Sequence, residues 1–140
     1  MLTIRSFQTG DETAIVELWH RCKLVRPHND PLKDIARKSK VRPDLFRVGI
    51  LKGTIIATVM IGYEGRRGWI NYLDVNPDHQ KQGFGRQMMK DAEGLLLAEG
   101  CPKINLMVRT SNAAVIDFYQ SLGFAVEETV CLGKRLEHDD

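Results

Sequence analysis

Two runs of β-branched and aliphatic residues, separated by only two residues, constrain the fold of this chain most strongly. The runs "LFRVGIL" (45–51) and "TIIATVMIGY" (54–63) have the composition of strands, and Lys52-Gly53 between them has the length and the glycine of a tight hairpin turn. A second turn, "EGRRG" (64–68), leads into "WINYLDV" (69–75). The sequence therefore predicts a three-stranded antiparallel meander.

The residues before the meander predict one more strand and two helices. The segment "LTIRSF" (2–7) alternates as a strand does, and Thr9 with Glu12 has the spacing of a capping box ahead of an amphipathic helix. The segment "RPHNDP" (26–31) interrupts this helix, because its two prolines and its Asn-Asp pair favour turns. A short polar helix over residues 32–39 follows.

The residues after the meander predict helices alternating with strands. A helix begins at Phe84 and ends near Gly100, and "KINLMV" (103–108) has the character of a buried strand. Thr110 or Ser111 can cap the next helix, and residues 124–136 are expected to form one or two closing strands. This order implies a mixed sheet with helices against its faces.

Size and composition indicate one globular domain, residues 1–140, whose formal net charge is +2. Basic and acidic residues are interspersed, so we expect neither a nucleic acid nor a membrane as partner. Without a membrane-length apolar stretch or a signal-peptide pattern, we expect a cytoplasmic protein. The three cysteines lack CxxC spacing, so we expect free thiols and no metal site. A homodimer is compatible with the sequence, which does not fix the oligomeric state.

The segment "HQKQGFGRQMMKDAE" (79–93) places two glycines at the start of a predicted helix. A dinucleotide fingerprint would need Gly or Ala where Met88 stands, and the Gly-Lys-Ser/Thr of a Walker loop is absent. The unpaired N–H groups of a helix N-terminus suit a pyrophosphate, and Lys81 and Arg86 add positive charge. The same local pattern is also typical of an ordinary turn with solvated basic residues that binds no phosphate.

A second segment favours the phosphate interpretation. The stretch Gln80-Lys81-Gln82-Gly83-Phe84-Gly85 fits Gln/Arg-x-x-Gly-x-Gly/Ala, and "SNAAVIDFYQSLGF" (111–124) fits Asn-x-x-Ala/Val followed by Phe-Tyr-x-x-x-Gly-Phe. In these two segments the chain resembles the GNAT superfamily of acetyl-CoA-dependent N-acetyltransferases. The stretch "LWHRCKLVRPHNDP" (18–31) also resembles the bacterial YpeA-type group, to which we assign no substrate.

The resemblance implies an α/β (α+β) fold with a mixed, mostly antiparallel sheet of six to seven strands and about four helices. It implies acetyl-CoA as acetyl donor, and no metal. The backbone of Leu73, Asp74 and Val75 would bond the pantetheine arm, and an N–H there could polarise the thioester carbonyl. The pyrophosphate would bind to Gln80, Lys81, Gln82, Gly83, Phe84, Gly85 and Arg86. Asn112 would hold the cofactor arm, and Tyr119 would lie near the thioester sulfur as general acid.

The general base stays open at this stage. Members that acetylate ribosomal-protein N-termini often carry a glutamate in the strand before the Asn helix, where this chain has Met107. Asp74, Tyr72 or Glu64 could act directly or through a water molecule, or the amine could arrive already neutral. We favour a water-relayed base.

The acceptor is expected to be a primary amine of a small molecule, an amino acid, or a protein N-terminus or lysine. The loop "VRPHNDP" (25–31) would line its pocket, with Arg26 attracting a carboxylate and Asp30 an ammonium, although Asn29 and Asp30 could simply cap the next helix. Two other functions are open. One is a non-catalytic acyl-CoA sensor, and the other is a nucleic-acid binder that uses Arg66, Arg67, Lys81 and Arg86.

Overall fold

The computed structural model describes residues 1–139. Helices and strands follow one another as β1 (Thr3–Ser6), α1 (Glu12–Arg21), α2 (Pro31–Lys38), β2 (Phe46–Leu51), β3 (Thr54–Tyr63), β4 (Gly68–Val75), α3 (Phe84–Ala98), β5 (Ile104–Leu106) and α4 (Ala113–Ser121). Short 3-10 helices span Pro43–Leu45 and Pro77–His79. Residues 1–106 with Asp139 form a first compact unit and residues 107–138 a second, and each is described by itself.

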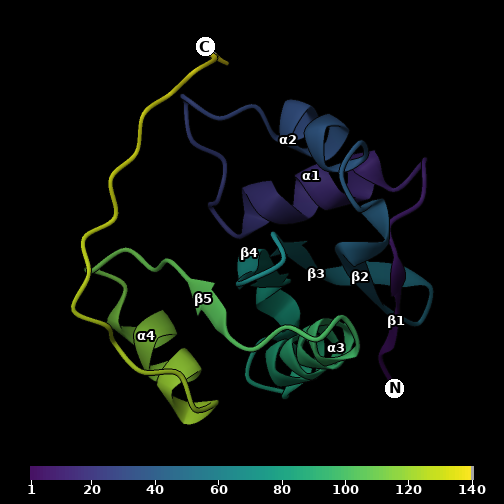
Figure 1. The fold of residues 1–140 in the computed structure, drawn as a ribbon. Helices are drawn as coiled ribbons and strands as arrows, with labels where there is room; N and C mark the ends of the chain where they lie inside the picture. The colour runs from purple at the N-terminus through teal and green to yellow at the C-terminus, as the bar shows by residue number, and fades with distance from the viewer. Residues whose placement is uncertain (140) are drawn as a thin grey trace. The chain divides into compact units, whose positions relative to one another are not determined.

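The sheet of the first unit has the strand order β1-β2-β3-β4-β5 (Figure 1). The first four strands pair antiparallel, and β5 pairs parallel to β4. The predicted meander is confirmed, and its first turn has Lys52 at φ 51° and Gly53 at φ 80°. Two successive left-handed residues are the signature of the type I′ turn, whose twist matches that of the strands it joins. The fold class is therefore the predicted mixed, mostly antiparallel one.

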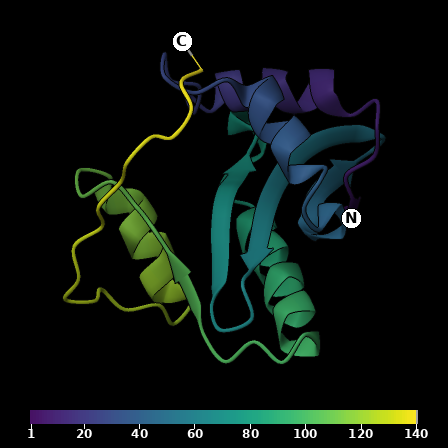
Figure 2. The same ribbon diagram turned by 45° about the horizontal axis from the view of Figure 1, so that its top comes forward.

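Helices cover both faces of this sheet. Figures 1 and 2 show α1 and α2 on one face and α3 on the other. Beneath α1 and α2 lies a core of buried apolar side chains, namely Ile15, Leu18, Trp19, Ile35, Phe46 and Val48. The opposite face is covered by the buried residues of α3, namely Met88, Met89, Ala92 and Leu96. Burial on both faces leaves the ends of the strands, and the loops that follow them, to form a site.

The starts of two helices differ from the expected ones. Helix α1 begins at Glu12 after Asp11, without a side-chain cap, because the Asp11 carboxylate instead accepts hydrogen bonds from Arg5 and the Gln8 N–H. The predicted Thr9 cap is therefore wrong. Helix α2 begins one residue earlier than expected, at Pro31, where the missing N–H of proline costs no helical hydrogen bond.

The second unit contains α4, which begins after Asn112 rather than after Thr110 or Ser111. Tyr119 is 8% exposed, and the rings of Phe118 and Phe124 contact it edge to face. Residues 122–139 contain no strand, so the described residues have five strands instead of six or seven. The expected closing strands rested on apolar residues that the structure exposes, namely Val126, Val130, Leu132 and Leu136. A strand needs a partner for its backbone, and alternation alone does not supply one.

Candidate active site

A β-bulge interrupts strand β4 near its carboxyl end. Thr58 of β3 pairs with Asp74 and Met60 pairs with Asn71, so β4 contains one residue more than β3 between the two pairs. Tyr72, in this extra stretch, has φ 50°. A bulky side chain seldom adopts this left-handed backbone, which costs on the order of 1 kcal/mol and persists only where surrounding contacts hold it.

Four contacts hold the bulge at Tyr72. The Trp19 ring stacks on the Tyr72 ring with centroids 3.9 Å apart. Trp19 Nε1 donates to Thr58 Oγ1 at 3.0 Å, and the Thr58 hydroxyl donates to the Tyr72 carbonyl at 2.8 Å. The Tyr72 hydroxyl donates to Asp34 Oδ2 at 2.7 Å. Helices α1 and α2 and strand β3 therefore all fix the position of this one residue.

Replacing Thr58 with valine is expected to destabilise the protein by about 1–3 kcal/mol. Thr58 is fully buried, and its hydroxyl serves both Trp19 and the Tyr72 carbonyl, which an isosteric methyl cannot do. Urea denaturation monitored by tryptophan fluorescence measures the change. Thr54→Val, at an exposed position of the same strand, is the control and should stay near wild type. Equal midpoints for both variants would contradict the proposed role of the hydroxyl.

Asp74 lies two residues beyond the bulge, opposite Thr58. Its Oδ2 atom is buried and has no hydrogen-bond partner within residues 1–139. Burial raises the pKa of this carboxyl from 3.8 to about 7, because removal from water disfavours the charged form. Burial, and secondarily the negative charge of Asp74, raises the pKa of the Cys22 thiol to about 11. Asp74 therefore titrates near neutrality, while Cys22 stays a thiol.

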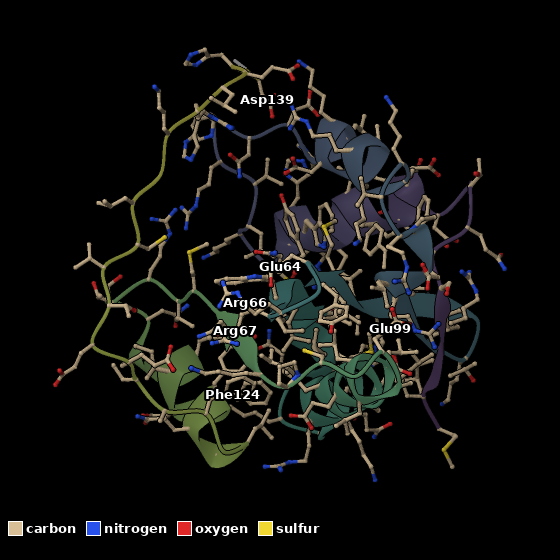
Figure 3. The ribbon with its side chains drawn as sticks, in the orientation of Figure 1. Glu64, Arg66, Arg67, Glu99, Phe124 and Asp139 are labelled. Carbon is tan, nitrogen blue, oxygen red and sulfur yellow. The ribbon has the colours of Figure 1, made fainter. Side chains whose placement is uncertain are left out.

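The other two candidate bases are held in different ways. Burial and the Asp34 carboxylate raise the pKa of Tyr72 far above its usual range, so its hydroxyl stays protonated and donates to Asp34. Glu64 Oε1 accepts hydrogen bonds from the N–H groups of Arg66 and Arg67 in the turn between β3 and β4 (Figure 3). Glu64 thus lies before the start of β4, at the other end of the strand from Val75.

The free edge of β4 begins just before the bulge. Parallel pairing with β5 ends at the pair Ile70 and Leu106, although β4 continues to Val75. Among residues 1–139, no strand therefore pairs with this edge over residues 71–75. Unpaired N–H and C=O groups along an edge can bond an extended ligand as a further strand would. Leu73, Asp74 and Val75 lie in this part.

The turn after β4 presents a helix N-terminus. Gln80 Nε2 donates to the Val75 carbonyl at 3.0 Å, which folds this side chain back onto β4. Lys81 has φ 62°, and Gly83, directly before α3, has φ 84°. No side chain in the described part of the chain caps α3, and the first turn of this helix has no acidic residue. The first bond of the helix runs from Gln87 N–H to the Gly83 carbonyl.

This turn fits an anionic group. A Cβ at Gly83 would meet no atom of residues 1–139 within 4 Å, so the backbone there is open to a ligand. The N–H groups of the first helical turn have no partner within the helix, and they carry the positive end of its dipole. The side chains around them, those of Lys81, Gln82 and Arg86, are exposed. A pyrophosphate could therefore contact both the backbone and full positive charges.

Two expected site residues belong to the second unit. Asn112 is exposed and stands directly before α4, and Tyr119 is buried within that unit. The structure thus brings together Leu73, Asp74, Val75 and the turn after β4, but it describes Asn112 and Tyr119 only within their own unit. The roles expected of these two residues remain proposals.

Two residues of the predicted acceptor loop have observed structural contacts, and one of them, Asn29, forms a side-chain hydrogen bond with Tyr72. Asp30 Oδ1 accepts hydrogen bonds from the N–H groups of Leu32 and Lys33, so this carboxylate caps α2. Arg26 is exposed and Asn29 is half-buried. The capping role considered for Asp30 is observed, whereas the contacts of Arg26, Asn29 and Asp30 with an acceptor remain proposals.

The four cations of a nucleic-acid surface lie on two separate turns. Arg66 and Arg67 precede β4, and Lys81 and Arg86 follow it, so the eight residues of β4 lie between the pairs. Eight extended residues span roughly 25 Å. The structure does not gather these charges into one patch.

The part of the chain that the structure describes contains neither a membrane-spanning helix nor a cluster of metal ligands. No helix within residues 1–139 is both long enough and apolar enough to span a membrane. In the same range, no three or more His, Cys, Asp or Glu side chains come together in a way that could hold a metal ion.

Comparison with known proteins assigns the family. A model of the acetyltransferase (GNAT) family matches residues 13–124, and the chain belongs to this family. An acetyltransferase of Yersinia pestis is 46% identical over 135 residues, which is 96% of both chains. An acetyltransferase of Pectobacterium atrosepticum is 46% identical over 138 residues, covering 99% of this chain and 98% of the relative.

A solved structure shows the same fold. The ribosomal-protein-S18-alanine N-acetyltransferase from Escherichia coli superimposes with a TM-score of 0.73 at 27% identity, covering 88% of this chain and 77% of that one. Family and fold together make the protein a GNAT acetyltransferase.

Proposed function

We propose that residues 1–140 act as one enzyme domain that transfers an acetyl group from acetyl-CoA to a primary amine, with Asp74 as the general base. The observation that carries this proposal is the buried Oδ2 of Asp74, which has no hydrogen-bond partner among residues 1–139 and belongs to the part of β4 with a free edge. A general base works best when its pKa lies near the working pH, and the pKa of Asp74 is about 7.

Asp74 can accept the proton that the acceptor must lose. An alkylammonium ion has no free electron pair, so it attacks a thioester only after deprotonation. The Asp74 carboxylate accepts this proton directly or through one water molecule, and no group within residues 1–139 hydrogen-bonds its Oδ2. Tyr72 and Glu64 are poorer candidates, because Tyr72 donates to Asp34 and Glu64 caps the turn before β4.

The observed surfaces fit coenzyme A. The free edge of β4 at Leu73, Asp74 and Val75 offers backbone groups to an extended arm with amide bonds. The open turn at Gly83 offers N–H groups to a pyrophosphate. Bound acetyl-CoA supplies the activated acetyl group, and these residues hold it in place. A PaiA N-acetyltransferase from Thermoplasma acidophilum, solved with coenzyme A, shares the fold at a TM-score of 0.77 and 19% identity over 93% of both chains.

Tyr119 would supply the second proton. The amine nitrogen forms a bond to the thioester carbon, the carbon–sulfur bond breaks, and the departing thiolate takes a proton from the Tyr119 hydroxyl, which regains one from the positively charged nitrogen of the adduct. Asn112 would hold the arm of the cofactor. The support for both roles is the match of residues 111–124 to the family segment.

Tyr119→Phe is expected to lower kcat by about 10²-fold while leaving the Kd for coenzyme A near its wild-type value. The substitution removes the hydroxyl but keeps the ring against Phe118 and Phe124. Steady-state kinetics and calorimetric titration measure the two quantities. Phe118→Tyr adds a hydroxyl on the same helix and serves as control. An unchanged kcat for Tyr119→Phe would exclude this tyrosine as the acid.

The proposed function is tested by release of free CoA thiol from acetyl-CoA over amines, amino acids and peptides. An enzyme gives turnover with at least one acceptor, and the acetylated amine is identified by mass spectrometry. A non-catalytic sensor would bind acetyl-CoA without turnover on any amine. Cofactor binding in calorimetry, together with a silent panel, would therefore favour the sensor.

A further inference from the structure

The carboxylate of Asp139 contacts Arg37 of helix α2 and the Asp30 N–H directly before this helix, in the first unit. The Asp139 side chain is only 1% exposed, although Asp139 follows a long exposed segment (Figure 3). Arg37 Nη2 contacts its Oδ1 at 2.7 Å, Arg37 Nη1 contacts its Oδ2 at 3.1 Å, and the Asp30 N–H donates to Oδ2 at 3.1 Å. These bonds, together with the charge of Lys33, hold the pKa of Asp139 well below its usual range.

The groups around Asp139 have the chemistry of a carboxylate receptor. A guanidinium that reaches both oxygens gives the bidentate geometry that arginine prefers with carboxylates. The Asp30 backbone N–H, at the amino-terminal end of α2, adds a third donor and the favourable end of the helix dipole. Because Asp139 is 102 residues from Arg37 in sequence, the site does not arise from local sequence.

A chain of contacts links this site to the proposed active site. Arg37 Nη1 also contacts Asp34 Oδ1 at 2.9 Å, and the other oxygen of Asp34 accepts the Tyr72 hydroxyl. Tyr72 stands in the β4 bulge, two residues before Asp74. Two side chains, those of Asp34 and Tyr72, therefore connect Arg37 to the strand segment that carries the proposed base, all of them within the first unit.

We propose that Arg37 and the Asp30 amide bind the carboxylate of the amine acceptor, and that Asp139 occupies this position until the acceptor replaces it. The site selects acceptors that carry an amine and a carboxylate at a fixed separation. The inference rests on the proposed acetyl transfer and specifies its substrate class. It differs from the role first expected for Arg26, because the observed carboxylate lies on Arg37.

Kinetics with matched acceptor pairs test the selectivity. Glycine, β-alanine, 4-aminobutyrate and 6-aminohexanoate are each compared with the corresponding amide, by CoA thiol release. Asp139→Asn removes the competing charge, and we expect a KM about tenfold lower for the acids of the fitting length and unchanged for the amides. Arg37→Gln in the Asp139→Asn background should abolish the preference for acid over amide. Identical KM values for acid and amide at every length would overturn the proposal.

Two peptides test whether the bound carboxylate belongs to a free amino acid or to an acidic side chain of a peptide. Gly-Asp-amide and Gly-Asn-amide differ only in one side-chain charge, and both lack a terminal carboxylate. If the enzyme prefers Gly-Asp-amide over Gly-Asn-amide by a larger factor than it prefers glycine over glycinamide, the site binds an acidic side chain of a peptide. If the factor for glycine over glycinamide is the larger one, the site binds the carboxylate of a free amino acid. Arg42→Gln is the matched control, because Arg42 also bridges two carboxylates, Asp44 and Glu99, neither of which belongs to the proposed site.

A binding measurement separates failure of this inference from failure of the proposed function. In ¹⁵N-labelled Asp139→Asn protein, N-acetylglycine should shift the Asp30 amide resonance, and N-acetylglycinamide should not. Arg37→Gln should remove the response, and Arg42→Gln should retain it. A shift of the Asp30 amide resonance without turnover on any amine would support the carboxylate site and contradict the proposed acetyl transfer. Turnover without this shift, and without a preference between acid and amide, would contradict the carboxylate site alone.

Discussion

Asp74→Asn is expected to lower kcat/KM for acetyl transfer by about 10²–10⁴-fold, the range that a positioned general base contributes. The amide has nearly the shape of the carboxyl but cannot accept a proton. In the wild type, kcat/KM should rise with pH through about 7, where Asp74 loses its proton, and this limb should disappear in the variant. Rates measured from pH 5 to 9 decide this. A variant with the wild-type profile would exclude Asp74.

The same substitution should change how stability depends on pH. Because the pKa of Asp74 is about 7 in the fold and near 3.8 in the unfolded chain, the folded state alone holds the proton between these values. The free energy of unfolding therefore falls as the pH rises from about 4 to about 7, and this loss stays constant above that range. A shift of about three units corresponds to roughly 2–4 kcal/mol after allowance for partial solvation.

Denaturant titrations at pH 4 and pH 8 measure this effect. The difference in free energy of unfolding between Asp74→Asn and wild type should shift in favour of the variant by roughly 2–4 kcal/mol from pH 4 to pH 8. Lower activity with a relative gain in stability at high pH is the combination expected of a buried functional carboxyl. Loss of stability at both pH values alike would instead indicate a purely structural residue.

Gly83→Asp is expected to weaken binding of coenzyme A by about 10²-fold. Asparagine tolerates the left-handed backbone that Gly83 adopts at φ 84°, and it differs from aspartate only in charge, so Gly83→Asn is the matched control. The new carboxylate would stand at the helix N-terminus, where we expect the pyrophosphate. Repulsion between two anions a few ångströms apart near a protein surface is worth a few kcal/mol, whereas Asn should cost about tenfold or less.

Acetylpantetheine, which lacks the pyrophosphate, separates the charge effect from a general defect. Its kcat/KM should be the same for Gly83→Asp and Gly83→Asn, whereas kcat/KM for acetyl-CoA should be lower by about tenfold or more for Gly83→Asp than for Gly83→Asn. Raising the salt concentration should narrow the difference for acetyl-CoA, because salt screens exposed charges. An equal penalty on both donors would mean that the turn does not face the pyrophosphate.

The elements that were predicted well have local signals. The Lys52-Gly53 turn, with two residues at positive φ, specifies the hairpin between β2 and β3 by itself. The Asp30-Pro31 pair marks the start of α2 through a side-chain cap and a proline at the first helical position. In both cases a few adjacent residues determine the backbone, so the sequence alone is sufficient.

The parts that were missed depend on distant residues. The bulge at Tyr72 has no glycine or proline, and its contacts come from Trp19, Thr58 and Asp34 on other elements. Thr58 did leave a signal, as a polar residue within an apolar run. The burial that shifts the pKa of Asp74, and the meeting of Arg37 with Asp139, exist only after folding. Sequence named Asp74 as one of three candidates, and its surroundings distinguish it.

Helix α2 is attached to the sheet in a different way from α1. Only Ile35 of its eight residues is buried, and its other anchors are polar, including Lys38 Nζ to the Ile61 carbonyl at 2.6 Å and Asp34 to Tyr72. Segments with little buried apolar surface open locally at a small fraction of the global unfolding free energy. The helix that carries the carboxylate site is therefore held mainly by polar contacts, whereas α1 is held by the buried side chains of Ile15, Leu18 and Trp19.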